Sequence, residues 1–147
     1  MVVEVAATLV RMVRILVIDD EPAIRLVVAA PLRRAGYEVE QAGGGREALA
    51  RLAQGGIELA LCDISMPDLS GIEVLRQARA AGHDASFVMM TAFSAIETAV
   101  EALQAGASDY LVKPVRSREL LHKLAQIAEL RALRSENAAL RQRLEGT

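Results

Sequence analysis

The feature of this sequence that most constrains its fold is an alternation, repeated five times, between short apolar runs and longer stretches with helical spacing. Residues 15–18 and 59–62 are apolar at every position, as expected of strands whose two faces are both covered by helices. Repeated units of one strand and one helix are typical of a parallel sheet. We therefore predict an α/β domain built on a five-stranded parallel sheet.

The same pattern predicts where each element begins and ends. The expected strands cover residues 14–18, 37–41, 57–62, 86–90 and 108–112, and the expected helices cover residues 22–35, 46–54, 71–81 and 95–105, with a last helix starting at residue 117. Pro31 lies inside the first helix, where its missing N–H predicts a bend or a break.

Composition and charge narrow the range of functions. The chain has 147 residues, of which 52% are hydrophobic, enough for one well-buried core but not for two ordinary domains. A formal net charge of −2 argues against direct binding to nucleic acid, because phosphate binding needs a surplus of basic residues on one face. The single cysteine, Cys62, lies in an apolar run, which indicates an inert core thiol in a reducing compartment such as the cytoplasm.

Residues 1–13 precede the first strand pattern, and we interpret them as an N-terminal extension. The opening MVVEVAATLVRM is apolar, but Glu4 interrupts it and no basic residue precedes it. The run is also shorter than the roughly 20 residues that a membrane span needs. We expect neither a membrane span nor a signal peptide, and either Met1 or Met12 could be the natural start.

Polar residues follow the predicted strands at the points where these strands end. Asp19 and Asp20 follow the first strand, Asp63 the third, Thr91 the fourth and Lys113 the fifth. The carboxyl ends of parallel strands share one edge of the sheet, where ligands bind in such folds. Clustered carboxylates raise one another's pKa unless a cation is present, and Mg²⁺ prefers a few carboxylates completed by water and phosphate oxygens. This set suits phosphoryl transfer onto a carboxylate.

Four segments, ILVIDDEP, LCDISMPDLSG, MMTAFS and SDYLVKP, resemble in sequence and order the motifs of receiver domains in two-component response regulators. The resemblance covers residues 14–127. It implies a flavodoxin-like, doubly wound sheet in the strand order 2-1-3-4-5, with five helices. It also implies a phosphorylation-controlled switch that receives its phosphoryl group from a sensor histidine kinase, and that catalyses only its own Mg²⁺-dependent phosphorylation and dephosphorylation.

The resemblance also assigns roles to individual residues. It implies that Asp63 is the phosphoacceptor, that Asp19, Asp20, Asp63 and the backbone carbonyl of Ser65 hold Mg²⁺, and that Thr91, Tyr110 and Lys113 respond to the phosphoryl group. Pro114 is expected to fix the loop after Lys113 through a cis bond. The face made by the fourth helix, fifth strand and fifth helix would transmit the change.

Two further expectations concern phosphate lifetime and a rival enzyme. Ser65 and Phe93 occupy positions that tune phosphate lifetime in receivers, and neither offers a carboxylate or amide to orient an attacking water. We therefore expect slow self-dephosphorylation.

The alternative to a receiver is a phosphatase of the haloacid dehalogenase type. Such enzymes carry a second aspartate two residues after the nucleophile, where this chain has Ser65.

The C-terminal part of the chain predicts a long helix. Residues 117–144 contain no Pro or Gly and would span roughly 42 Å as a helix. An a/d pattern is formed by Leu130, Leu133, Asn137, Leu140 and Leu144, and an asparagine at an a position favours a parallel dimer in fixed register. The open alternative is an amphipathic linker that frays when isolated.

We therefore divide the chain into a receiver domain, residues 14–128, and a coiled-coil linker, residues 129–147. A receiver followed by such a helix resembles the start of transcription activators in which the receiver controls an AAA+ ATPase. On that reading, ATPase and DNA-binding domains follow Thr147 in the natural protein. A stand-alone or phosphorelay receiver without an output domain is the alternative.

Overall fold

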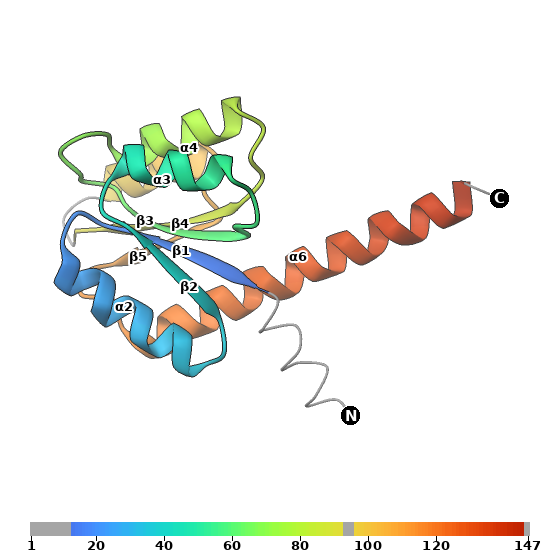
Figure 1. Ribbon diagram of the computed structural model, residues 1–147, viewed down its shortest axis with the longest axis horizontal. Helices are drawn as coiled ribbons and strands as arrows, with labels where there is room; N and C mark the ends of the chain where they lie inside the picture. The colour runs from blue at the N-terminus through green and yellow to red at the C-terminus, as the bar shows by residue number, and fades with distance from the viewer. Residues whose placement is uncertain (1–12, 93–95, 146–147) are drawn as a thin grey trace.

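The computed structural model describes residues 13–92 and 96–145. Its centre is a five-stranded parallel sheet in the order β2-β1-β3-β4-β5 (Figure 1). The strands are β1 (Arg14–Ile18), β2 (Glu38–Ala42), β3 (Leu59–Asp63), β4 (Ser86–Thr91) and β5 (Asp109–Val112). The predicted doubly wound order is confirmed, and each strand begins and ends within two residues of its predicted position.

Helices cover both faces of this sheet. They are α2 (Pro22–Arg34), α3 (Gly45–Ala53), α4 (Gly71–Ala80), α5 (Ile96–Gln104) and α6 (Ser117–Glu145). The bend or break expected at Pro31 does not end α2, which continues to Arg34. Pro31 is buried and lies in the last turn of α2. Its missing N–H therefore removes a hydrogen bond only near the end of the helix, where few helical residues remain.

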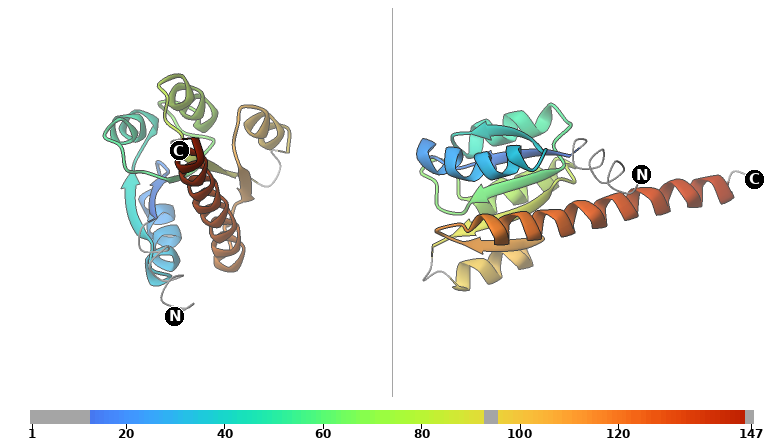
Figure 2. Two further views of the ribbon diagram at one scale, coloured as in Figure 1. Left: turned by 90° about the vertical axis from the view of Figure 1, so that its right-hand side faces the viewer. Right: turned by 90° about the horizontal axis from the view of Figure 1, so that it is seen from below.

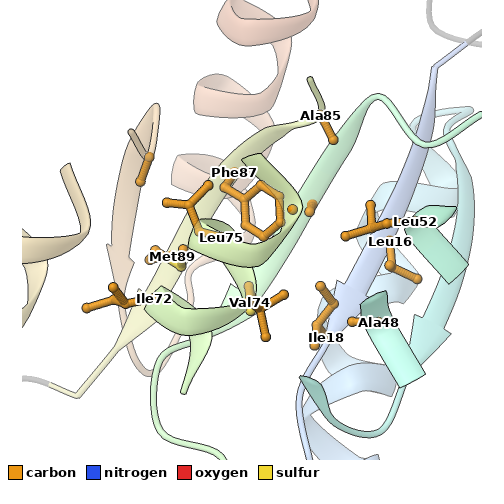
Figure 3. Packing of buried hydrophobic residues seen from close by; sticks show 14 of the residues in the cluster. Leu16, Ile18, Ala48, Leu52, Ile72, Val74, Leu75, Ala85, Phe87 and Met89 are labelled. Atoms are coloured by element: carbon orange, nitrogen blue, oxygen red, sulfur yellow. The ribbon is translucent and has the colours of Figure 1, made fainter. Parts of the chain in front are cut away.

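Successive strand residues point into two separate cores. Leu16 and Ile18 of β1 pack with residues of α3, α4 and α5, and Figure 3 shows the part of this core around Phe87 and Leu75. Ile15, on the opposite face of β1, packs with residues of α2 and α6. This double burial explains why the central strands are apolar at every position.

Helix α6 is packed against the domain only along its first half. Leu120 and Leu124 are buried in the core that α6 shares with α2, whereas Leu133 and Leu140 are about half exposed. Figure 2 shows the remaining turns extending away from the sheet. The expected long C-terminal helix is therefore present through Glu145.

Among the helices that the structure describes, none is both long and apolar enough to cross a membrane. The N-terminal extension, apart from Val13, lies outside the described residues.

Candidate functional site

The fold brings the polar residues at the strand ends to one edge of the sheet. Asp63 is the last residue of β3 and Thr91 the last of β4. Asp19 directly follows β1, and Lys113 directly follows β5. The backbone N–H of Lys113 donates to the Thr91 carbonyl at 2.8 Å, so the parallel pairing of β4 and β5 continues up to the site itself.

Three carboxylates meet at this edge. One oxygen from each of Asp19, Asp20 and Asp63 lies within 4.8 Å of the others. Asp19 is fully buried, Asp63 is nearly so, and Asp20 is exposed. Three carboxylate oxygens on one open side fit a hard divalent cation whose other ligands are water and a substrate oxygen.

The ammonium group of Lys113 lies between the two buried carboxylates. Its Nζ is 2.8 Å from Asp19 Oδ2 and 3.3 Å from Asp63 Oδ2. Burial lowers the pKa of Lys113, but the hydrogen bond that Lys113 donates to Asp19 and the charges of Asp63 and Asp19 outweigh this effect and leave the pKa raised. Lys113 therefore stays charged at neutral pH.

The pKa of Asp63 is raised above its ordinary value. Burial is the largest cause, and the charge of Asp19 adds to it. Lys113 and the backbone N–H of Ser65, which donates to Asp63 Oδ1 at 3.3 Å, act in the opposite direction. A carboxylate in this position gains from any additional cation, because its ionised form is only partly compensated.

The other expected site residues surround this centre. Thr91 is buried, and its Oγ1 donates to the Ala92 carbonyl in a long contact of 3.4 Å, so the hydroxyl is weakly held. Tyr110 is partly buried and packs against the core on the α3, α4 and α5 face, with Lys123 Nζ 5.3 Å from its ring centre. The Lys113–Pro114 bond is cis, as expected. Phe93 lies outside the described residues.

The segment after β3, residues 64–70, contains contacts that the sequence interpretation missed. The Ser70 hydroxyl caps α4 by accepting from the Glu73 N–H at 3.2 Å, a pairing that the S-x-x-E spacing could have indicated. The Asp68 carboxylate accepts from backbone N–H groups at the start of α3. No local sequence signal indicates this second contact, because the partners are more than 20 residues away.

Glycine is required where α4 begins. A Cβ on Gly71 would overlap the backbone carbonyl of Asp63, and the Gly71 N–H donates to the Ile64 carbonyl at 2.8 Å. Helix α4 therefore starts in direct contact with the backbone of Asp63.

A doubly wound sheet with polar residues at its carboxyl edge defines a class of α/β domains that bind their ligands at this edge. Residues 15–125 match the response regulator receiver domain family, and the chain belongs to that family. This membership favours the receiver interpretation over the phosphatase alternative.

Several known proteins share this similarity. The chain is 44% identical over 112 residues to the transcriptional regulatory protein ZraR of Salmonella typhimurium, covering 74% of this chain and 25% of that protein. It is 41% identical over 127 residues to the response regulator MprA of Mycobacterium bovis, covering 86% of this chain and 54% of MprA. The chain thus spans between a quarter and about half of the length of these relatives.

Solved structures show the same fold. A CheY-like receiver domain protein from Methanospirillum hungatei superposes with a TM-score of 0.78 at 36% identity, covering 84% of this chain and 98% of that one. NtrX from Brucella abortus superposes with a TM-score of 0.83 at 32% identity, covering 89% of this chain and 30% of that one. The similarity to NtrX thus extends over most of this chain and less than a third of NtrX.

Proposed function

We propose that this receiver domain accepts a phosphoryl group on Asp63 from a phosphohistidine of a sensor histidine kinase. The observation that carries the proposal is the convergence of Asp19, Asp20, Asp63 and Lys113 within one edge of the sheet. Three carboxylates and one ammonium group leave a net negative charge, which a divalent cation would balance.

We assign Mg²⁺ as that cation, held by carboxylate oxygens of Asp19, Asp20 and Asp63 and by the backbone carbonyl of Ser65. When bound, Mg²⁺ neutralises negative charge that the phosphoryl oxygens bring into the site. The oxygen-only donor set supports this choice.

In the proposed transfer, an oxygen of the Asp63 carboxylate forms a bond to phosphorus while the bond from phosphorus to the histidine nitrogen breaks. That nitrogen keeps the electron pair. The Lys113 ammonium pairs with the incoming phosphoryl oxygens, and the weakly held Thr91 hydroxyl donates to one of them. The contribution of the chain is positioning and charge stabilisation rather than a second nucleophile.

The phosphoryl group adds a charge of about −1.5 to −2 at this edge. Thr91 and Lys113 then move toward it, and the space that Thr91 leaves admits the Tyr110 ring. The surface formed by α5, β5 and α6 changes in consequence. Apolar side chains already exposed on this surface, Ile96, Val100 and Val112, make it suited to binding another protein surface.

We further propose residues 14–128 as the receiver unit and residues 129–147 as a linker that forms a parallel coiled-coil dimer. The half-exposed Leu133 and Leu140 support this role of α6. ZraR and MprA are named as regulators, ZraR of transcription, which supports control of transcription as the output. We also propose a cytoplasmic location, and ATPase and DNA-binding domains after residue 147. The alternative is a receiver that acts alone or in a phosphorelay.

The proposal also includes slow self-dephosphorylation. Ser65 is exposed near Asp63, and its hydroxyl is a weaker guide for an attacking water than a carboxylate or amide. A phosphoryl group that decays within seconds on the purified protein would contradict this part of the proposal.

The direct test is to incubate the protein with Mg²⁺ and a small acyl phosphate, and then measure its intact mass. We expect wild type to gain one phosphoryl group and Asp63→Asn to gain none. Asp84→Asn, at the opposite edge of the sheet, is the matched control and should gain one. The same mass for wild type with and without the acyl phosphate would overturn the proposal.

A further inference from the structure

The segment between β3 and α4, residues 64–70, is held to the start of α3 by the side chain of Asp68. Asp68 Oδ1 accepts from the Gly45 N–H at 3.1 Å, and Oδ2 accepts from the Arg46 N–H at 3.0 Å. The first N–H groups of a helix have no partner within the helix, and its positive dipole end favours a carboxylate. The hydrogen bonds from Arg46 and Gly45 hold the pKa of Asp68 at about 2.

The packing at this contact is tight. A Cβ on Gly45 would lie 2.7 Å from Leu69 Cβ and 2.8 Å from Val74 Cγ2, closer than side chains approach one another. Helix α3 therefore begins directly against the segment after β3 and the first turns of α4. The Asp68 hydrogen bonds therefore join two segments that are packed so closely that Gly45 could not carry a larger side chain.

Both ends of residues 64–70 are fixed by the backbone. The Ile64 N–H donates to the Met90 carbonyl at 3.0 Å, and the Ile64 carbonyl accepts from Gly71. Between these ends, the Ser65 N–H donates to Asp63 Oδ1 at 3.3 Å, and the Asp68 carboxylate accepts from the first N–H groups of α3. Ser65 therefore lies between its own contact with Asp63 and the contact that Asp68, three residues later, makes with α3.

We infer that Asp68 is a positioning residue for the metal site: by holding residues 64–70 against α3, it fixes the segment that carries the backbone carbonyl of Ser65. This inference rests on the proposed function, because it takes the Ser65 carbonyl as a Mg²⁺ ligand. Asp68 is not one of the three clustered carboxylates, and both of its oxygens accept from backbone N–H groups of α3.

The experiment is a calorimetric Mg²⁺ titration of the full chain in four forms: wild type, Asp68→Ala, Asp68→Asn and Glu47→Ala. Glu47 is the matched control, because its Oε2 accepts from the Gly43 N–H at 2.8 Å beside the same helix start without touching residues 64–70. Loss of a residue that orients a metal ligand typically weakens metal affinity by 10- to 100-fold, so we expect the Kd of Asp68→Ala to rise about tenfold.

Asp68→Asn keeps one acceptor oxygen and should show a smaller rise in Kd, which keeps the test valid if Asp68→Ala folds poorly. Glu47→Ala should bind Mg²⁺ as wild type does. A second measurement is amide exchange without Mg²⁺: the N–H of Ser65 should exchange faster in Asp68→Ala and not in Glu47→Ala. A merely structural role would lower the melting temperature of both variants without separating their Mg²⁺ affinities.

An unchanged Kd in both Asp68 variants, or equal weakening in Glu47→Ala, would overturn the inference while leaving the proposed function intact. If wild type itself does not bind Mg²⁺, the proposed function fails and the inference fails with it. The wild-type titration therefore distinguishes the two failures.

Discussion

Lys113 Nζ lies 2.8 Å from Asp19 Oδ2, although 94 residues separate the two in the sequence. The two residues follow β5 and β1, between which β3 and β4 lie in the sheet. Because the Asp19 side chain is fully buried, its charge needs a nearby cation. Lys113 supplies that cation in this structure. Because its Nζ also lies 3.3 Å from Asp63 Oδ2, it is placed to form an ion pair with a phosphoryl group on Asp63.

Replacing this lysine should cost both stability and phosphorylation. Removing one partner of a fully buried ion pair costs about 3–5 kcal/mol. The Lys113 side chain is 22% exposed, so we expect Lys113→Ala to lower the free energy of unfolding by about 2 kcal/mol and to slow phosphorylation of Asp63. Urea unfolding without Mg²⁺ measures the first effect. Lys123→Ala is the control, because Lys123 is 21% exposed and pairs with a less buried aspartate, Asp109; equal losses in the two variants would contradict the argument.

Neutralising the proposed phosphoacceptor should stabilise the metal-free protein. The pKa of Asp63 is raised, chiefly by burial, so the folded state disfavours the ionised form relative to the unfolded state, and stability falls as the pH rises through this pKa. Asp63→Asn should therefore melt at a higher temperature than wild type at pH 7 in EDTA. Added Mg²⁺ should stabilise wild type more than the variant. A lower melting temperature for Asp63→Asn in EDTA would refute this electrostatic account.

The ion pair between Glu40 and Arg51 predicts a pH dependence of stability away from the site. Arg51 Nε and Nη2 lie 2.6 and 2.8 Å from the two Glu40 oxygens, and the Arg51 hydrogen bond is the main cause of the lowered pKa of Glu40. A lowered carboxyl pKa stabilises the fold above the ordinary value of 4.5 and loses this effect as the pH falls. Glu40→Gln should cost about 0.5 kcal/mol at pH 7 and less at pH 3.

Urea unfolding at the two pH values checks this. Glu38→Gln is a useful comparison, because Glu38 also pairs with an arginine, Arg14, but its side chain is 55% exposed. It should cost less than Glu40→Gln at pH 7. A cost for Glu40→Gln that is the same at pH 3 would mean that the pair stabilises through packing rather than charge.

The exposed leucines of α6 predict oligomerisation. If Leu133 and Leu140 form an a/d seam with a second copy, the double variant Leu133→Ser and Leu140→Ser should sediment as a monomer at concentrations where wild type is a dimer. Ala139→Ser, at an exposed position outside the a/d pattern, should leave the dimer unchanged. Sedimentation equilibrium measures both variants. A monomeric wild type would contradict the coiled-coil dimer and support the alternative, an amphipathic linker.

The local stability of the middle of α6 should depend on Arg131. Its Nη1 donates to the Asp84 carbonyl at 2.8 Å and to Ser86 Oγ at 3.0 Å, past the last buried residues of α6. A hydrogen bond is worth about 1 kcal/mol, so Arg131→Ala should speed amide exchange in residues 127–135 about fivefold. Arg134→Ala, at an exposed position in the same stretch of α6, is the control. Exchange that stays unchanged in Arg131→Ala would mean that apolar packing alone holds this part of α6.

The sequence by itself determined the parallel sheet and the edge at which function is sought. Apolar runs such as residues 15–18 predict strands buried on both faces, and the residues that follow them must then meet at one edge, because all strands run in the same direction. This is why Asp19, Asp63, Thr91 and Lys113 could be grouped, and why the receiver family could be recognised from the segments around them.

Only the tertiary structure decided how these residues are paired and which of them are buried. Neighbouring Asp19 and Asp20 are equivalent in the sequence, yet Asp19 is buried against Lys113 while Asp20 is exposed. The contact of Asp68 with the start of α3 joins residues more than 20 positions apart. Such contacts depend on strand register and on the close approach that Gly45 allows. Three-dimensional packing sets the distances between these residues, and the local sequence pattern does not contain them.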